Sequence, residues 1–365
     1  MGFRCGIVGL PNVGKSTLFN ALTRTAAAQA ANFPFCTIEP NVGDVAVPDP
    51  RLDKLAAIAG SKQIIPTRLT FVDIAGLVKG ASRGEGLGNQ FLANIRECDA
   101  VAHVLRCFEG GDVTHVEGRV DPVADAETIE TELMLADLDS VEKRLANLSR
   151  KLRGGDKEAA DQDRLLRLAK EALEAGRPAR SVRVSDEDQK AWRMLQLLTA
   201  KPVVYVCNVE EAAAAEGNAL SARVFDMAAR EGASAVVISA AIESELAQLA
   251  DEERDAFLAE MGLSEPGLDR LIRAGYGLLN LITYFTVGPK EARAWTVPAG
   301  TRAPQAAGVI HGDFERGFIR AETIAYEDYV ANNGEQGAKE AGRFRLEGKD
   351  YVVADGDVLH FRFNA

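Results

Sequence analysis

Five short apolar runs in the first 240 residues read as buried β-strands. They are the runs 3–8, 69–72, 101–107, 202–207 and 235–238. After the first run, apolar residues recur with helical spacing at Leu18, Phe19, Ala21 and Leu22. Strands that alternate with helices predict an α/β fold with a doubly wound, mostly parallel sheet.

Between about residues 128 and 200 the composition changes to Glu, Lys, Arg, Leu and Ala. Apolar residues step by three and four through this stretch, with an interruption at Gly154-Gly155-Asp156. The seam before the interruption is Leu138, Val141, Leu145, Leu148 and Leu152, and the seam after it is Leu165, Leu168, Ala169, Ala172 and Leu173. The pattern predicts an antiparallel helical hairpin, or coiled-coil insertion, between two parts of the α/β domain.

The last ninety residues read as a separate module of strands around one short helix. The apolar segments are 281–287, 294–297, 318–326, 351–353 and 358–361, and the helix is expected over 303–311. The Asp355-Gly356 turn predicts a hairpin between the last two segments. Without a cluster of metal ligands or nucleophiles, this pattern favours a β-grasp binding module. The expected domains are 1–127 and 201–275 for the α/β domain, 128–200 for the insertion and 276–365 for the module.

Composition places the chain among ordinary globular proteins, with 47% apolar and 26% charged residues over 365 positions. No apolar run approaches the roughly 18 residues of a membrane span, and no signal peptide precedes the first strand. Five cysteines without close pairs argue against a disulfide framework, so we expect a cytoplasmic protein without a membrane partner. Cys36 lies in a polar loop and is a candidate reactive thiol.

The first strand leads into a phosphate-binding loop, Gly9-Leu10-Pro11-Asn12-Val13-Gly14-Lys15-Ser16, followed by Thr17. A glycine loop between a strand and a helix N-terminus directs successive backbone N–H groups at an anion. We expect residues Asn12, Val13, Gly14, Lys15, Ser16 and Thr17 to hold the phosphates of a nucleoside triphosphate. Lys15 would reach the β- and γ-phosphates, and the Ser16 hydroxyl would bind Mg²⁺.

Two further elements have the spacing of a nucleotide switch. Thr37 lies between prolines some twenty residues past the loop, where its hydroxyl would coordinate Mg²⁺; the alternative is a plain surface turn. Asp73 ends the second strand and is placed to hold Mg²⁺ through water. Gly76 would let its N–H approach the γ-phosphate.

The residue that follows Gly76 bears on catalysis. Many small GTPases have a glutamine there to orient the attacking water, whereas this chain has Leu77, which cannot hydrogen-bond water. Hydrolysis is then slow, or another group supplies that function. His115, in the loop after the third strand, is the candidate; the alternative is a solvated polar residue. His103 lies within the strand and is interpreted as structural.

The base-reading residues favour adenine over guanine. In an N-K-x-D reader the aspartate accepts from guanine N1–H and the 2-amino group. Here Asn208 is followed by Val209, and Glu211 takes the aspartate position with one extra methylene. Adenine needs an acceptor for its 6-amino group and a donor for N1, which Asn208 and the backbone near Val209 would offer. These residues point to ATP.

The tip of the helical insertion is basic in an acidic chain. Its cations are Lys143, Arg144, Arg150, Lys151, Arg153 and Lys157, against Asp156 alone. The net charge of −12 argues against a surface that binds nucleic acid everywhere. The tip is either a solvated helix face or a contact with a phosphate backbone, for which RNA is the natural candidate.

Taken together, these residues resemble the YchF subfamily of Obg-related ATPases along the whole chain. The resemblance rests on the phosphate loop, on 32–37, on 73–80, on the N-x-x-E pattern at 208–211 and on 305–308. It implies a G domain, a helical insertion and a C-terminal TGS domain. It also implies Mg²⁺-dependent ATP hydrolysis, with His115 matching the catalytic histidine and Val209 the base contact. Asn12 resembles the asparagine of potassium-stimulated relatives, so K⁺ is a further expected cofactor.

The resemblance further implies binding to the ribosome, chiefly its large subunit, and no DNA partner is expected. The favoured interpretation is an ATPase switch whose nucleotide state controls ribosome association. One alternative is a GTPase of the Obg type. The other is a nucleotide-gated scaffold that binds a protein partner and in which hydrolysis is incidental.

Overall fold

The structure is a computed structural model that describes residues 3–30, 41–74, 87–109, 120–152 and 156–364. The chain divides into two compact units. The first, called the nucleotide unit below, comprises Met1–Val45 and Thr70–Gly275. The second, called the C-terminal unit, comprises Ala46–Leu69 and Tyr276–Ala365. None of the described helices is long and apolar enough to cross a membrane.

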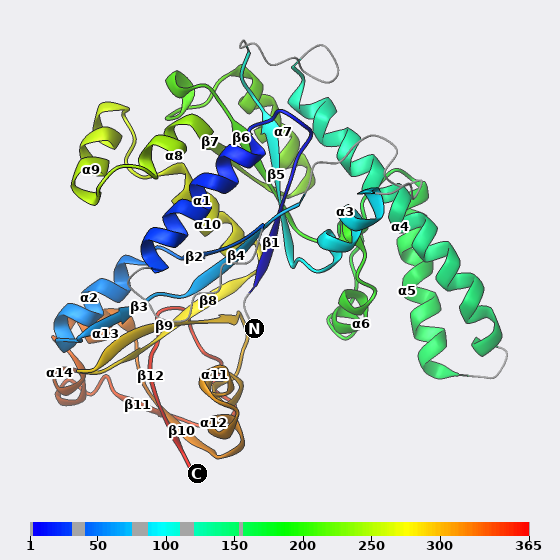
Figure 1. The fold of residues 1–365 in the computed structure, drawn as a ribbon. Helices are drawn as coiled ribbons and strands as arrows, with labels where there is room; N and C mark the ends of the chain where they lie inside the picture. Colours follow the sequence, from blue (N-terminus) through cyan, green and yellow to red (C-terminus); the bar gives the residue numbers. More distant parts are fainter. Residues whose placement is uncertain (1–2, 31–40, 75–86, 110–119, 153–155, 365) are drawn as a thin grey trace. The chain divides into compact units, whose positions relative to one another are not determined.

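The nucleotide unit is built on a six-stranded sheet in the order β2-β4-β1-β5-β6-β7 (Figure 1). Its strands are β1 (Arg4–Val8), β2 (Val42–Ala46), β4 (Arg68–Asp73), β5 (Ala100–Arg106), β6 (Val203–Asn208) and β7 (Ser234–Ile238). β1 pairs in parallel with β4 on one side and β5 on the other, and β5, β6 and β7 continue in parallel. Because the order reverses at β1, the loops after β1, β4 and β6 meet at one edge, where such folds bind ligands. The predicted doubly wound α/β fold is confirmed.

Helices cover this sheet and lie between its strands along the chain. They are α1 (Lys15–Ala30), α3 (Leu87–Arg96), α7 (Ala219–Glu231), α8 (Ala240–Leu246), α9 (Asp251–Glu260) and α10 (Gly267–Leu278). The boundaries of α7 follow from capping: the Asn218 side chain accepts from the N–H groups of Leu220 and Ser221, and Gly232 ends the helix at φ 66°.

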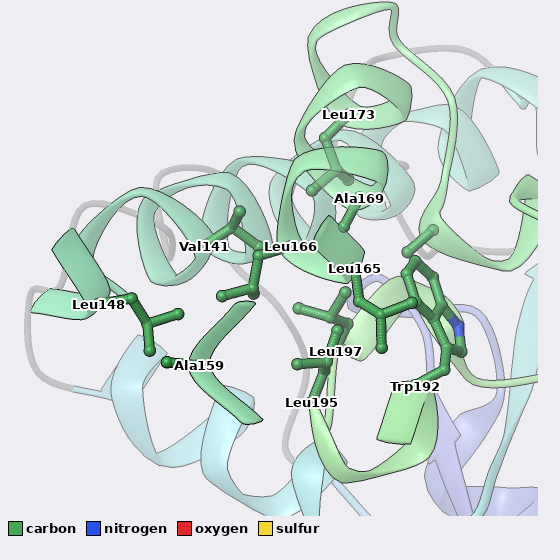
Figure 2. Packing of buried hydrophobic residues seen from close by; sticks show 11 residues of the cluster. Val141, Leu148, Ala159, Leu165, Leu166, Ala169, Leu173, Trp192, Leu195 and Leu197 are labelled. Carbon is green, nitrogen blue, oxygen red and sulfur yellow. The ribbon is translucent and has the colours of Figure 1, made fainter. Parts of the chain in front are cut away.

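The helical insertion consists of α4 (Pro122–Leu152), α5 (Lys157–Glu174) and the short α6 (Gln189–Met194). α4 begins six residues before the expected boundary at 128. Figure 2 shows Val141 of α4 facing Leu166 of α5, Leu148 of α4 beside Ala159 of α5, and Leu165 beside Trp192, all in one buried cluster. Burying these side chains offsets the cost of ordering two long helices, since propensity alone stabilises helices weakly.

Buried polar groups fix α4 to the segments on either side of α6. The Asp137 carboxylate of α4 accepts from the backbone N–H groups of Leu198 and Thr199, at 2.8 Å each, and from the Thr199 hydroxyl. Burial raises the pKa of Asp137, although these hydrogen bonds oppose the shift. Arg180, which lies between α5 and α6, pairs with Glu130 of α4 at 2.8 Å. The base of the insertion is therefore fixed by directional contacts as well as by apolar packing.

The C-terminal unit contains a second six-stranded sheet, in the order β11-β10-β12-β8-β9-β3. Its strands are β3 (Gln63–Ile65), β8 (Leu281–Val287), β9 (Glu291–Pro298), β10 (Phe318–Ile324), β11 (Arg345–Glu347) and β12 (Val358–Phe363). Its helices are α2 (Pro50–Ala59), α11 (Ala303–Ile310), α12 (Gly312–Arg316), α13 (Tyr326–Ala331) and α14 (Glu335–Glu340). One apolar cluster packs α2, α13 and α14 on the sheet, and another packs α11 around Tyr284 and Phe361.

Two expectations about this unit need correction. Residues 46–69, assigned from sequence to the α/β domain, belong to the C-terminal unit, because Leu52 and Leu55 pack on Phe285 and β3 pairs with β9. The expected hairpin around Asp355-Gly356 is absent from the described residues. β12 pairs instead with β10 and β8, and Val352 forms a single bridge to Arg302. The turn signal was local, whereas the strand partners lie far away in the sequence.

Candidate nucleotide-binding site

The phosphate loop runs from the end of β1 to the start of α1 with the backbone that its glycines and asparagine permit. Asn12 and Gly14 have positive φ, at 66° and 89°. A Cβ on Gly9 would lie 2.8 Å from the Val104 carbonyl oxygen, so the loop passes close against β5. Asn12, Ser16 and Thr17 are exposed, while Val13 is buried and anchors the loop. The loop therefore presents polar groups outward from a fixed base.

Lys15 and Asp73, assigned from sequence to the phosphates and to Mg²⁺, lie side by side in the structure. The Lys15 ammonium donates to the Asp73 carboxylate, and Lys15 is only 9% exposed. Parallel pairing of β1 and β4 sets Ile7 opposite Asp73, which puts the carboxylate beside the loop. The site thus contains a cation suited to phosphate next to a carboxylate suited to a metal.

The donor set fits Mg²⁺. This ion prefers oxygen ligands and usually binds through one or two carboxylates, waters and substrate phosphates, not an all-protein cage. Ser16 supplies an exposed hydroxyl and Asp73 a partly exposed carboxylate. Among the described residues no group of three or more His, Cys, Asp or Glu side chains could hold a metal.

Asn208, the last residue of β6, links the phosphate loop to the start of α8, which follows β7. Its Nδ2 donates to the Val13 carbonyl at 2.9 Å, and its Oδ1 accepts from the Ala240 N–H at 2.9 Å. The amide is buried, and a Cβ on Gly14 would lie 2.2 Å from Nδ2. Asn208 therefore holds the site together through hydrogen bonds within the protein, and these bonds do not depend on which base is bound.

The base-side residues after Asn208 are arranged in a way that sequence did not reveal. The Val209 N–H donates to the Ile238 carbonyl at 2.9 Å, so this backbone donor is used within the protein. Glu211 is exposed at the start of a short 3₁₀ helix. Glu210 instead accepts from Asn218, whose Nδ2 also donates to the Cys107 carbonyl at 2.6 Å.

Asn218 is the functional-site residue that sequence reasoning missed. Its place before an apolar helix is an N-cap signal, but its link to Cys107 at the end of β5 is visible only in the structure. It holds the base-side loop next to the strand that precedes residues 110–119.

Several predicted site residues lie outside the described residues. These are Thr37, Gly76, Leu77 and His115, together with Cys36; the side chains of Arg150, Lys151 and Arg153 are likewise not described. His103 is buried in β5 beside Tyr205, and burial lowers its pKa to about 3, so it stays neutral. That placement agrees with a structural role.

Sequence profiles of two families match the chain. The first family, described as "50S ribosome-binding GTPase", matches residues 4–136. The second, YchF-GTPase_C, described as "Protein of unknown function (DUF933)", matches residues 281–364. A Haemophilus influenzae protein named "Ribosome-binding ATPase YchF" is 60% identical over 364 residues, covering 100% of both chains. The chain belongs to the YchF family. A Bacillus subtilis member of the same name is 56% identical over 366 residues, again covering 100% of both chains.

The solved structures agree with this membership in the YchF family. One titled "Structure of the Schizosaccharomyces pombe YchF GTPase" is 38% identical, with a TM-score of 0.89, and the match covers 99% of this chain and 98% of that one. A GTP-binding protein from Pyrococcus horikoshii, at 19% identity and a TM-score of 0.61, shows the shared fold alone. The names of these relatives differ on the nucleotide, which is ATP in some and GTP in another. The base-side residues of this chain therefore bear on which nucleotide it binds.

Proposed function

We propose that this protein is an ATP-hydrolysing switch that binds the ribosome in a nucleotide-dependent way. Its similarity over the full length to relatives named ribosome-binding ATPase is the observation that carries the proposal. The joined phosphate loop, Lys15–Asp73 pair and Asn208 bridge support nucleotide binding in the first unit. The ribosomal partner is proposed as the large subunit and its RNA.

In this proposal Lys15 leaves the Asp73 carboxylate to contact the β- and γ-phosphates, and the loop N–H groups between Asn12 and Thr17 hold the remaining phosphate oxygens. Mg²⁺ supplies charge neutralisation between the phosphates. Ser16 and Thr37 would hold it directly, and Asp73 would do so through water. K⁺ beside Asn12 would add positive charge at the same phosphates.

We assign to His115 the positioning or polarising of the attacking water, because Leu77 cannot orient a water molecule. Gly76 would place an N–H near the γ-phosphate. The change in Thr37 and Gly76 contacts on loss of that phosphate is the switch through which ribosome association would respond. We further propose that the C-terminal unit is a TGS module, supported by the parallel pairing of β8 with β12 next to the β8–β9 hairpin.

Nucleotide choice tests the chemical part of this function. Calorimetry with Mg²⁺ and non-hydrolysable analogues should give at least about tenfold tighter binding of the ATP analogue, because guanine would leave donors unpaired near Glu211. Val209→Lys with Glu211→Asp should narrow or reverse the preference. Tighter binding of the GTP analogue by the parent would establish the Obg-type GTPase alternative in its place.

Ribosome association needs its own measurement. The protein should pellet with ribosomes to different extents in ATP, ADP and no nucleotide, and ribosomes should stimulate multiple turnover. Equal pelleting in all three conditions, without stimulation, would favour the nucleotide-gated scaffold for a protein partner.

A further inference from the structure

One face of the C-terminal sheet is half covered and half open. Ile324 of β10 and Val358 of β12 lie beneath α2 and α13 in a buried cluster. Side chains alternate along a strand, so residues two and four positions away lie on the same face. On the open half these are Arg320 and Glu322 of β10 and His360 and Arg362 of β12, and both arginines and His360 are exposed.

Strand register sets two arginines directly against each other on this open half. Arg320 is the antiparallel partner of Arg362, and Glu322 is the partner of His360. Like charges directly opposite on a sheet destabilise it, whereas opposite charges stabilise it. Taken alone, the Arg320–Arg362 pair is therefore unfavourable in the free unit.

Glu322, the carboxylate between these side chains, is already engaged. Arg362 donates to Glu322 through Nε at 2.9 Å and Nη2 at 3.1 Å, and Glu322 itself is only 9% exposed. Glu335 of α14 also acts electrostatically on Arg362 but pairs with Lys339. Among the residues that the structure describes, the Arg320 guanidinium forms no hydrogen bond or ion pair.

A solvent-facing arginine pair with one free guanidinium suits an anionic partner that binds both. Guanidinium groups match phosphate oxygens in planar, bidentate geometry, and two adjacent ones can engage one stretch of phosphate backbone. In a chain with net charge −12, such attraction must be local.

We propose that Arg320, His360 and Arg362 form a phosphate-backbone contact through which the C-terminal unit binds RNA. The choice of RNA over an acidic protein rests on the proposed ribosome binding, since ribosomes expose long stretches of RNA phosphate. This contact is separate from the basic tip of the helical insertion.

The test is the substitution Arg320→Glu in the full-length chain, because it should leave stability equal or higher while it weakens RNA binding. It replaces a like-charge pair by an opposite-charge pair, so the urea midpoint of the C-terminal unit should stay equal or rise. That midpoint is followed by Trp295 fluorescence in a Trp192→Phe background. Arg302→Glu, an exposed site that pairs with Asp350, is the control for net charge.

Binding is measured by the anisotropy of a fluorescein-labelled RNA duplex with a single-stranded overhang, over a series of KCl concentrations. Arg320→Glu should weaken binding by at least about fivefold and lower the slope of log K against log salt by about one, relative to Arg302→Glu. Failure of the parent to bind the RNA, or equal loss in both variants, would overturn the proposal. Tighter binding of labelled poly-glutamate than of the RNA by the parent, lost in Arg320→Glu, would identify an acidic protein surface as the partner instead. Retained RNA binding without ribosome pelleting would refute the proposed function and leave this contact standing.

Discussion

The contact between Gly14 and Asn208 allows a double-mutant test of how the nucleotide site is built. Asn208→Ala would remove a buried amide that satisfies the Val13 carbonyl and the Ala240 N–H. Each buried backbone group left unsatisfied costs about 1–3 kcal/mol, so with two such groups this variant should lose roughly 2–6 kcal/mol of unfolding free energy.

Gly14→Ala should damage the same bonds from the other side. Its Cβ would lie 2.2 Å from Asn208 Nδ2, which forces the amide away, and its φ of 89° adds backbone strain of about 1–2 kcal/mol. In the double variant the clash is gone and the Asn208 bonds are lost only once. The double variant should therefore cost about 2 kcal/mol less than the sum of the two single variants.

The assay is urea unfolding followed by Trp192 fluorescence in a Trp295→Phe background, so that the signal comes from the nucleotide unit. Gly232→Ala is the matched control, because its φ of 66° brings the same backbone strain while its Cβ would meet no atom within 4 Å. The control should lose about 1–2 kcal/mol. If the Gly14 and Asn208 effects add within about 0.5 kcal/mol, the two residues do not act through one contact and the reasoning is wrong.

Three further outcomes are expected. His115→Ala should lower the rate of ATP hydrolysis severalfold or more with nearly unchanged ATP affinity, and equal rates would remove His115 from the mechanism. Reversal of Arg150, Lys151 and Arg153 to Glu should weaken ribosome pelleting while hydrolysis by the free protein barely changes; undiminished pelleting would return the tip to a solvated face. Burial raises the pKa of Glu243 from 4.5 to about 7, so the folded protein holds a proton that the unfolded chain releases and stability should fall by roughly 3 kcal/mol as the pH rises from 4.5 through 7. Glu243→Gln should flatten that dependence in urea unfolding across the same pH range, and an unchanged slope would exclude Glu243 as its source.

Sequence predicted what depends on local pattern and on one-dimensional spacing. The Gly9–Ser16 motif predicted the loop, and the place of Asp73 beside that loop followed from its position at the end of a buried strand. The seam through Val141 and Leu165 predicted the packing of α4 on α5, because apolar spacing is written along each helix.

Sequence did not predict what depends on partners distant along the chain. Residues 46–69 join a sheet made of residues more than two hundred positions later, and nothing in their composition marks that exchange. The Asp355-Gly356 turn was similarly ambiguous, since a turn signal states where the chain bends but not which strand lies alongside. The Asn208 amide was expected to face the base, yet the structure shows it bonded to Val13 and Ala240.

The placement of Asn208 bears on why some members of the family are named ATPases and another a GTPase. Because its amide bonds mainly to the protein, Asn208 would hold the phosphate loop and the base-side loops together with either base. Discrimination must then rest on the residues beyond it, where Val209 uses its N–H within the sheet and Glu211 is exposed. A shared framework with few discriminating side chains explains how closely similar folds can differ in nucleotide. We therefore expect substitutions at residues 209 and 211 to change base preference without rebuilding the site.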